Sequence, residues 1–169
     1  MEIRSVEAIV RVLNDEDVQY IVVGGLAVNM HGYERFTQDV DLVIGLEHHN
    51  ILRGLRALVR IGYSPAIPIT PEEFADPENR RRWRRDKNMI VLKLWSDIHR
   101  RTPIDVFVYH PFDFEKEYSS IKRVEFAEGP GIPFVSRDTL LAMKRLAGRP
   151  QDLADIAALE EIREISDKD

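Results

Sequence analysis

Three aspartates are the residues of this sequence whose spacing most favours chemistry. Asp39 and Asp41 stand two residues apart where the apolar run 40–44 begins. In a strand both side chains point to the same side, roughly 7 Å apart, and their charges repel unless a cation lies between them. Asp105 is the single acid of a second apolar run, 104–108. If the two strands are neighbours, about 4.8 Å apart, a third carboxylate joins the same rim.

Three carboxylate ligands suit a hard divalent cation, Mg²⁺ or Mn²⁺. The chain has no cysteine, which excludes thiolate metal sites, disulfides and cysteine nucleophiles. The ordinary explanation for such acids is a strand end that faces water. Gly24-Gly25 weighs against it, because a glycine turn after a strand offers backbone amides to a phosphate. A metal rim and a phosphate turn together predict a site that handles phosphates.

Residues 23–44 resemble the first motif of the DNA polymerase beta-like nucleotidyltransferase superfamily. That motif is an apolar residue, Gly, Gly or Ser, a spacer, and Asp-x-Asp among apolar neighbours. The glycine pair and the two aspartates match it, and Asp105 matches the third acid of the superfamily. Arg35, Phe36 and Thr37 are similar to the lead-in of the minimal nucleotidyltransferases of the abortive-infection (AbiEii-like) toxin branch.

The segment 144–156 also resembles that branch, whose last motif carries a Lys, an Arg and then Lys-Asp-x-x-Asp. Lys144, Arg149, Asp152 and Asp155 fit this motif, and Gln151 stands where the branch has a Lys. This departure affects one phosphate or acceptor contact and leaves the metal site intact.

The resemblance implies a two-metal mechanism. Asp39 and Asp41 would ligate the metal that carries a nucleoside triphosphate, and with Asp105 the second metal. Asp105 would also help to deprotonate the acceptor hydroxyl that attacks the α-phosphorus. Pyrophosphate would leave against the metal and the amides of Gly24 and Gly25.

Thr37, Lys144 and Arg149 complete the nucleotide-binding set that the resemblance implies. The two cationic side chains would contact triphosphate oxygens. An equally ordinary explanation for them is a solvated helix end, where bases complement the helix dipole.

The implied reaction is transfer of a nucleoside monophosphate to a hydroxyl of RNA, for example a tRNA, or of a protein. The enzyme would act as the toxin of a toxin–antitoxin pair, with an antitoxin protein as partner. A non-catalytic nucleotide-binding or regulatory protein of the same fold is one alternative. A phosphodiester hydrolase is another alternative. The Gly-Gly turn favours transfer over hydrolysis.

One basic segment and one lysine have two explanations each. Arginines at 80–82, 84 and 85 with Trp83 suit an RNA backbone and a stacked base, but a solvated helix face with one packed aromatic is the more ordinary explanation. Lys93, inside an apolar strand, either faces the nucleotide or lies on the exposed face of an edge strand.

The elements that position these residues follow from hydrophobic periodicity. Helices are expected at 5–17 (with Ser5 as N-cap), 26–31, 51–59, part of the basic segment, 136–148 and 150–164, and strands at 19–23, 40–44, 89–95 and 104–108, the last two antiparallel, with an edge hairpin at 121–126 and 132–135. The fold class is α/β, a mixed sheet of the nucleotidyltransferase palm type flanked by helices. The helices would cover one face, and the acids would lie along one edge. Residues 1–169 would form a single domain, with C-terminal helices 137–164 packed on it.

Composition limits the partners. The chain has 24 basic and 29 acidic residues and a formal net charge of -5, which argues against binding nucleic acid through bulk charge. Any such contact needs a local basic patch. We read neither a secretion signal nor an apolar run of about 20 residues that could cross a bilayer, so a cytoplasmic protein without membrane contact is expected.

Overall fold

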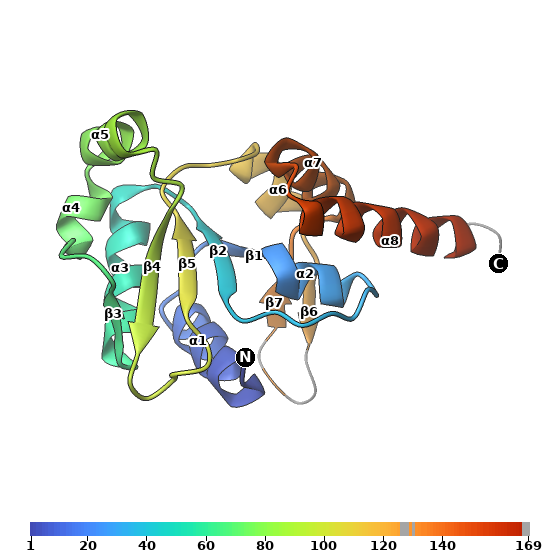
Figure 1. Ribbon diagram of the computed structural model, residues 1–169. Coiled ribbons are helices and arrows are strands. Elements are labelled where there is room, and N and C mark those ends of the chain that lie inside the picture. Colours follow the sequence, from blue (N-terminus) through green and yellow to red (C-terminus); the bar gives the residue numbers. More distant parts are fainter. Residues whose placement is uncertain (126–128, 130, 167–169) are drawn as a thin grey trace.

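Figure 1 shows a twisted sheet with helices on both of its faces and a long C-terminal helix that projects to one side. The computed structural model describes residues 1–125, 129 and 131–166 of the chain. The described helices are α1 (Ile3–Asp15), α2 (Gly24–Met30), α3 (His48–Arg60), α4 (Pro71–Ala75), α5 (Pro77–Lys87), α6 (Phe114–Ser120), α7 (Arg137–Ala147) and α8 (Pro150–Ser166). The described strands are β1 (Tyr20–Val23), β2 (Val40–Ile44), β3 (Tyr63–Pro65), β4 (Val91–Ser96), β5 (Ile104–Phe107), β6 (Arg123–Glu125) and β7 (Gly131–Pro133).

The main sheet has the strand order β1-β2-β5-β4-β3. Strands β2 and β5 are parallel, whereas the other neighbouring pairs are antiparallel. The predicted mixed sheet and the antiparallel pairing of β4 with β5 are therefore confirmed. The predicted hairpin forms a separate sheet of β6 and β7, which contacts β1 where Val135 N donates a hydrogen bond to Val22 O. Residues 126–128 and 130 of that expected hairpin lie outside the described residues.

The burial of the strands shows which faces the helices cover. All four residues of β1 are buried, whereas β4 alternates between buried residues and exposed ones. Helices α1 and α3 pack together on one face, and α2 covers the other face at β1 and β2 (Figure 1). The expectation that helices cover only one face is therefore wrong, because β1 is apolar at every position and needs cover on both sides. The second face stays open at β4 and β5.

Several boundaries differ from those expected from the sequence. Helix α1 begins at Ile3 after Glu2, and Ser5 is a buried helical residue beside His99 rather than the N-cap. Helix α2 begins directly at Gly24. Strand β3 and helices α4 and α6 were not expected. The basic segment is helical as expected.

The C-terminal helices begin and end as the sequence indicates. The Ser136 side chain accepts a hydrogen bond from Thr139 N at the start of α7, and Gly148 ends that helix in the left-handed conformation with φ of 62°. Pro150 starts α8. Helix α7 packs against both α8 and α2. None of the helices in the described ranges is long and apolar enough to span a membrane.

Candidate active site

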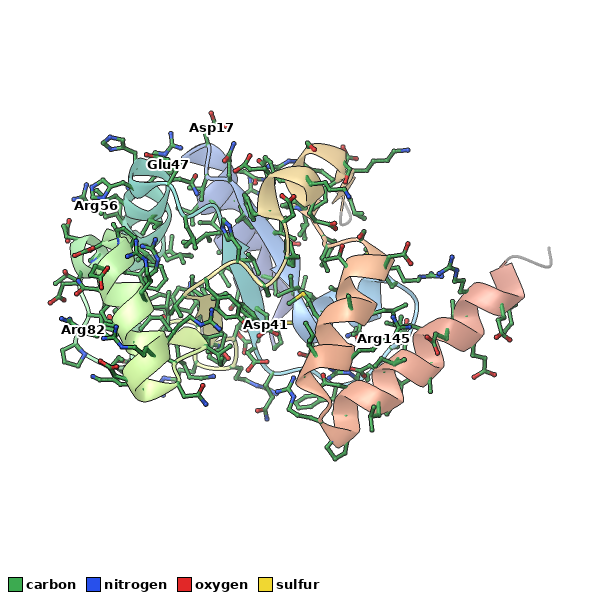
Figure 2. All side chains as sticks on the ribbon, turned by 90° about the horizontal axis from the view of Figure 1, so that it is seen from above. Asp17, Asp41, Glu47, Arg56, Arg82 and Arg145 are labelled. Atoms are coloured by element: carbon green, nitrogen blue, oxygen red, sulfur yellow. The ribbon has the colours of Figure 1, made fainter. Side chains whose placement is uncertain are left out.

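Strand register brings two of the three predicted acids side by side. Asp41 and Asp105 are direct partners in the parallel pair β2 and β5, and Asp39 lies two residues before Asp41, so its side chain points to the same face. Viewed from above, Asp41 lies between α5, the helix of Arg82, and α7, the helix of Arg145 (Figure 2). Asp41 and Asp105 thus lie on two inner strands and Asp39 directly before one of them, on the face that the helices leave open; the expected position along one edge of the sheet is wrong.

Lys93 faces the same acids from the neighbouring strand. It pairs with Asp105 across β4 and β5, and its Nζ lies 2.9 Å from Asp105 Oδ1 and 3.8 Å from Asp39 Oδ2. Strand β4 is not at the edge of the sheet, because β3 pairs with its other side. The explanation of Lys93 as an edge-strand lysine is therefore wrong.

Burial is the main influence on the protonation of Asp41 and Asp105. Burial raises the pKa of Asp41 to about 7, and the charges of Asp39 and Asp105 act in the same direction, while Lys144 and Arg149 oppose them. Burial also raises the pKa of Asp105, although Lys93 lowers it. A buried acid whose pKa is shifted this far by burial and by neighbouring acids is typical of a functional site.

Gly24 and Gly25 let the backbone approach these side chains closely. Gly24 has φ of +66°, and a Cβ at this position would lie 1.9 Å from Asp41 Oδ2. A Cβ on Gly25 would lie 2.4 Å from the Oγ1 of the buried Thr37. A side chain at either position would displace Asp41 or Thr37, so the glycine pair is what allows these two side chains to pack against the backbone.

A buried ion-pair cluster joins α7 to α8 next to this site. Lys144 Nζ lies 2.6 Å from Asp155 Oδ2 and 3.3 Å from Asp152 Oδ1, and its side chain is 6% exposed. Arg149 binds both carboxylate oxygens of Asp152, at 2.7 and 3.2 Å, while its side chain stays 74% exposed. Although burial alone raises the pKa values of Asp152 and Asp155, hydrogen bonds from their cationic partners hold both below the usual range. Of the two predicted triphosphate contacts, Arg149 is thus accessible and Lys144 is enclosed.

Arg35 ties the segment before β2 to this cluster. Its Nε lies 2.7 Å from Asp155 Oδ1, and its second terminal nitrogen donates to Asp155 Oδ2 at 2.9 Å. Gln151, which replaces a lysine of the family motif, donates to Asp155 Oδ1 at 3.0 Å. The sequence alone predicts no role for Arg35 beyond its place in the lead-in, because its partner Asp155 lies 120 residues further along the chain.

The basic helix α5 borders the open face of the sheet. Trp83 is 7% exposed and packs against Phe74, so it is unavailable to stack on a base. The Arg84 guanidinium lies 3.6 Å above the ring of Tyr109, just beyond the end of β5. A cavity of about 240 Å³ lies between α5 and residues 108–110.

The donor set of the site suits a hard divalent cation, since it consists of carboxylate oxygens. Asp105 Oδ1 is buried and lacks a well-formed hydrogen bond, even though the Lys93 ammonium is close. Within residues 1–125, 129 and 131–166, however, no three side chains are gathered into a ready-made metal cluster. The ligand chemistry and the unsatisfied Asp105 oxygen thus suit a metal although the side chains are not gathered around one point, and Lys93 already neutralises part of their charge.

Solved structures share this fold. A lincosamide antibiotic adenylyltransferase, LnuA, bound to lincomycin, has a TM-score of 0.61 at 15% sequence identity, over 96% of this chain and 98% of the other. An antigenic nucleotidyltransferase-like protein from Paracoccidioides brasiliensis has a TM-score of 0.54 at 18% identity, over 92% of this chain and 73% of the other. The predicted nucleotidyltransferase fold is confirmed. A search among curated proteins finds no match.

A sequence profile extends this likeness from the fold to the family. The family described as "Nucleotidyl transferase AbiEii toxin, Type IV TA system" matches residues 7–169, which include both motifs and the acid between them. The resemblance predicted from those motifs is confirmed. The chain belongs to the AbiEii family and is a nucleotidyltransferase.

Proposed function

We propose that the protein transfers a nucleoside monophosphate from a nucleoside triphosphate to a hydroxyl of RNA, with Mg²⁺ or Mn²⁺. The observation that carries this proposal is the register of Asp41 and Asp105 on adjacent strands, with Asp39 on the same face. Mutual repulsion makes such a cluster costly in a protein that does not bind a cation. Asp39, Asp41 and Asp105 would hold the divalent ion, which when bound supplies positive charge to the triphosphate.

The protein groups around the acids have separate tasks in this reaction. Gly24 and Gly25 let Asp41 and Thr37 pack against the turn after β1, whose backbone amides would bind triphosphate oxygens. Arg149 is the exposed cation that would contact the triphosphate oxygens. The pKa of Arg149 is raised mainly by its hydrogen bond with Asp152 and to a smaller extent by the charge of Asp41. Asp105 accepts the proton of the acceptor hydroxyl. The hydroxyl oxygen then bonds to the α-phosphorus while the bond to pyrophosphate breaks and pyrophosphate leaves.

Lys144 has a positioning task in this proposal. Its ammonium is enclosed by Asp152 and Asp155, so it fixes the start of α8 rather than contacting the triphosphate itself. Asp152 in turn holds Arg149 through two hydrogen bonds. The buried cluster thereby sets where the exposed guanidinium stands relative to the acids.

Helix α5 favours RNA over protein as the acceptor. It carries six basic and two acidic residues in a chain of net charge -5, and it borders the open face that holds the acids. A local basic surface of this kind complements a phosphate backbone. Modification of an RNA would make the protein the toxin of a pair whose antitoxin opposes this activity.

An apolar groove favours a second candidate acceptor, a small molecule. The groove, about 650 Å³, lies between α1, α2 and β7, and its lining includes Leu26, Phe36 and Phe134. Phe36 directly precedes Thr37 and is 76% exposed. LnuA, which shares the fold, is an adenylyltransferase with a small-molecule antibiotic bound.

Labelling experiments separate these acceptors. The protein is incubated with each nucleoside triphosphate labelled at the α-phosphorus, Mg²⁺ or Mn²⁺, and separate RNA, protein and small-molecule fractions of a cell extract. We expect label in RNA, lost in Asp39→Asn and Asp41→Asn but retained in Asp15→Asn, which alters an exposed acid of α1.

The other outcomes have distinct meanings. Transfer that persists in both site variants contradicts the site, and label in another fraction reassigns the acceptor. Triphosphate binding without transfer favours the non-catalytic alternative. Label released as free nucleoside monophosphate, with none on any acceptor, favours a hydrolase.

A further inference from the structure

Lys93 stands in an unusual place for a lysine in a strand. Strand β4 has neighbours on both sides, β3 and β5, and yet the Lys93 side chain lies on the open face among the acids. Lysines in sheets are typical of exposed edges, where they prevent edge-to-edge pairing. That purpose does not apply to an inner strand. The position of Lys93 is therefore explained by a partner on the open face of the sheet.

The partners are the carboxylates on one side of the acid cluster. Lys93 Nζ lies 2.9 Å from Asp105 Oδ1 and 3.8 Å from Asp39 Oδ2, so the ammonium bridges these two residues. Asp41 belongs to β2, one strand beyond Asp105, and thus begins about 10 Å from β4 at a strand spacing near 4.8 Å. The ammonium therefore occupies the side of the cluster between Asp39 and Asp105 and leaves the side at Asp41 free.

Charge balance limits what else this cluster can bind. The ionised acids carry three negative charges, which one divalent ion and the Lys93 ammonium together neutralise. A second divalent ion between Asp39 and Asp105 would have to sit about 2.1 Å from the oxygen that the ammonium already approaches. The two cations would repel each other at short range in a partly buried site.

We propose that Lys93 takes the place of a second divalent ion, so that the free protein binds one divalent ion at its three acids. Lys93 supplies the other positive charge from within the chain. This inference rests on the proposed function only in assigning the acids to metal binding. It departs from the two-metal arrangement that the family resemblance implies, because the lysine fills part of that arrangement.

Counting bound Mn²⁺ tests the inference without nucleotide or turnover. The full chain is titrated with Mn²⁺ alone, and free Mn²⁺ is followed by electron paramagnetic resonance. We expect one ion per chain in the wild type and in Lys93→Arg, and two in Lys93→Met, which keeps an unbranched side chain one atom shorter and removes its charge. Lys116→Met, at an exposed lysine of α6, should bind one ion, as the wild type does.

Two ions in the wild type would overturn the inference, and this result needs no variant. It would equally be overturned by a single ion of unchanged affinity in Lys93→Met, or by no bound Mn²⁺ in any form of the protein. Circular dichroism verifies that each variant is folded, and Lys93→Gln replaces Lys93→Met if the latter unfolds. The expected counts without any transfer of label would reject the proposed reaction and leave the role of Lys93 standing.

Discussion

At the scale of single residues, Asp41 couples the protonation of the site to the stability of the fold. Its pKa is about 7 in the folded protein, against roughly 4 for an unfolded chain, so the folded state holds this proton more tightly. Its contribution to stability is thus complete below about pH 4 and is lost as the pH rises through 7. A bound cation would offset that loss, because it favours the ionised form.

The variant Asp41→Asn, which cannot ionise, should therefore match the wild type near pH 4 and exceed it at pH 8. A shift of three pKa units corresponds to about 4 kcal/mol, and the access of solvent to the open face reduces this to about 2 kcal/mol. Urea denaturation of both proteins in a metal chelator at pH 4, 6 and 8 measures the difference. A stability difference that does not change with pH would contradict the assignment of this pKa.

Gly24 is needed both for its positive φ and for its close approach to Asp41. Gly148 has only the first of these features and therefore serves as the control. Both have positive φ, +66° and +62°, but a Cβ on Gly24 meets Asp41, whereas a Cβ on Gly148 finds its nearest neighbour at 3.7 Å. Gly148→Ala should cost about 1 kcal/mol of backbone strain and leave nucleotide transfer unchanged. Gly24→Ala should displace the Asp41 side chain and abolish transfer. Thermal denaturation and label transfer measure the two effects, and equal activity in both variants would show that the close approach of Gly24 to Asp41 is unimportant for transfer.

At the scale of elements, the junction of α7 and α8 depends on one buried ammonium. Lys144→Met leaves the carboxylates of Asp152 and Asp155 without their shared partner, and the loss of one member of a buried ion pair costs about 3–5 kcal/mol. Arg145→Met, at the next residue, breaks an exposed pair with Glu160 and should cost less than about 1 kcal/mol. Urea denaturation measures both values. Similar costs would mean that the buried cluster contributes little to holding α8 in place.

The strands that carry the acids could be predicted because Asp41 and Asp105 are the only polar residues in their apolar runs, 40–44 and 104–108. The alternation of side chains along β2 also places Asp39 and Asp41 on one face. The three-residue strand β3 escaped prediction because a segment that ends in Pro65 is too short to show periodicity. Helices α4 and α6 were missed for the same reason, although Thr70 and Asp113 mark their N-caps.

Pairings between distant parts of the chain could not be derived from spacing. The parallel pairing of β2 with β5 joins residues more than 60 positions apart and decides that Asp105 meets Asp41. The positions of Lys93 and Arg35 depend on the same tertiary arrangement. The antiparallel pairing of β4 with β5 was predicted. The sequence did not predict which residues of the two strands face each other, so it did not reveal Lys93 as the partner of Asp105.

At the scale of the whole molecule, the charges are unevenly distributed around the open face. Helix α5 is strongly basic in an acidic chain, and the acid cluster lies between α5 and the C-terminal helices (Figure 2). An incoming RNA would be attracted by the basic helix and repelled by the acids until a cation neutralises them. Binding of the cation and binding of the RNA should therefore be coupled.

The arginines of α5 allow a test of RNA binding that is independent of catalysis. Arg81 and Arg82 are exposed. Figure 2 labels Arg82 on α5, to the left of Asp41. Fluorescence anisotropy with a single-stranded RNA, measured over a range of salt concentrations, gives the slope of log K against log salt. Each phosphate contact that is lost should reduce this slope by about 0.7, so Arg81→Gln and Arg82→Gln should both flatten it. Arg11→Gln removes an exposed charge from α1 on the opposite face and should leave the slope unchanged. A uniform response of all three variants would mean that RNA responds only to net charge, and α5 would then have no special place in acceptor binding.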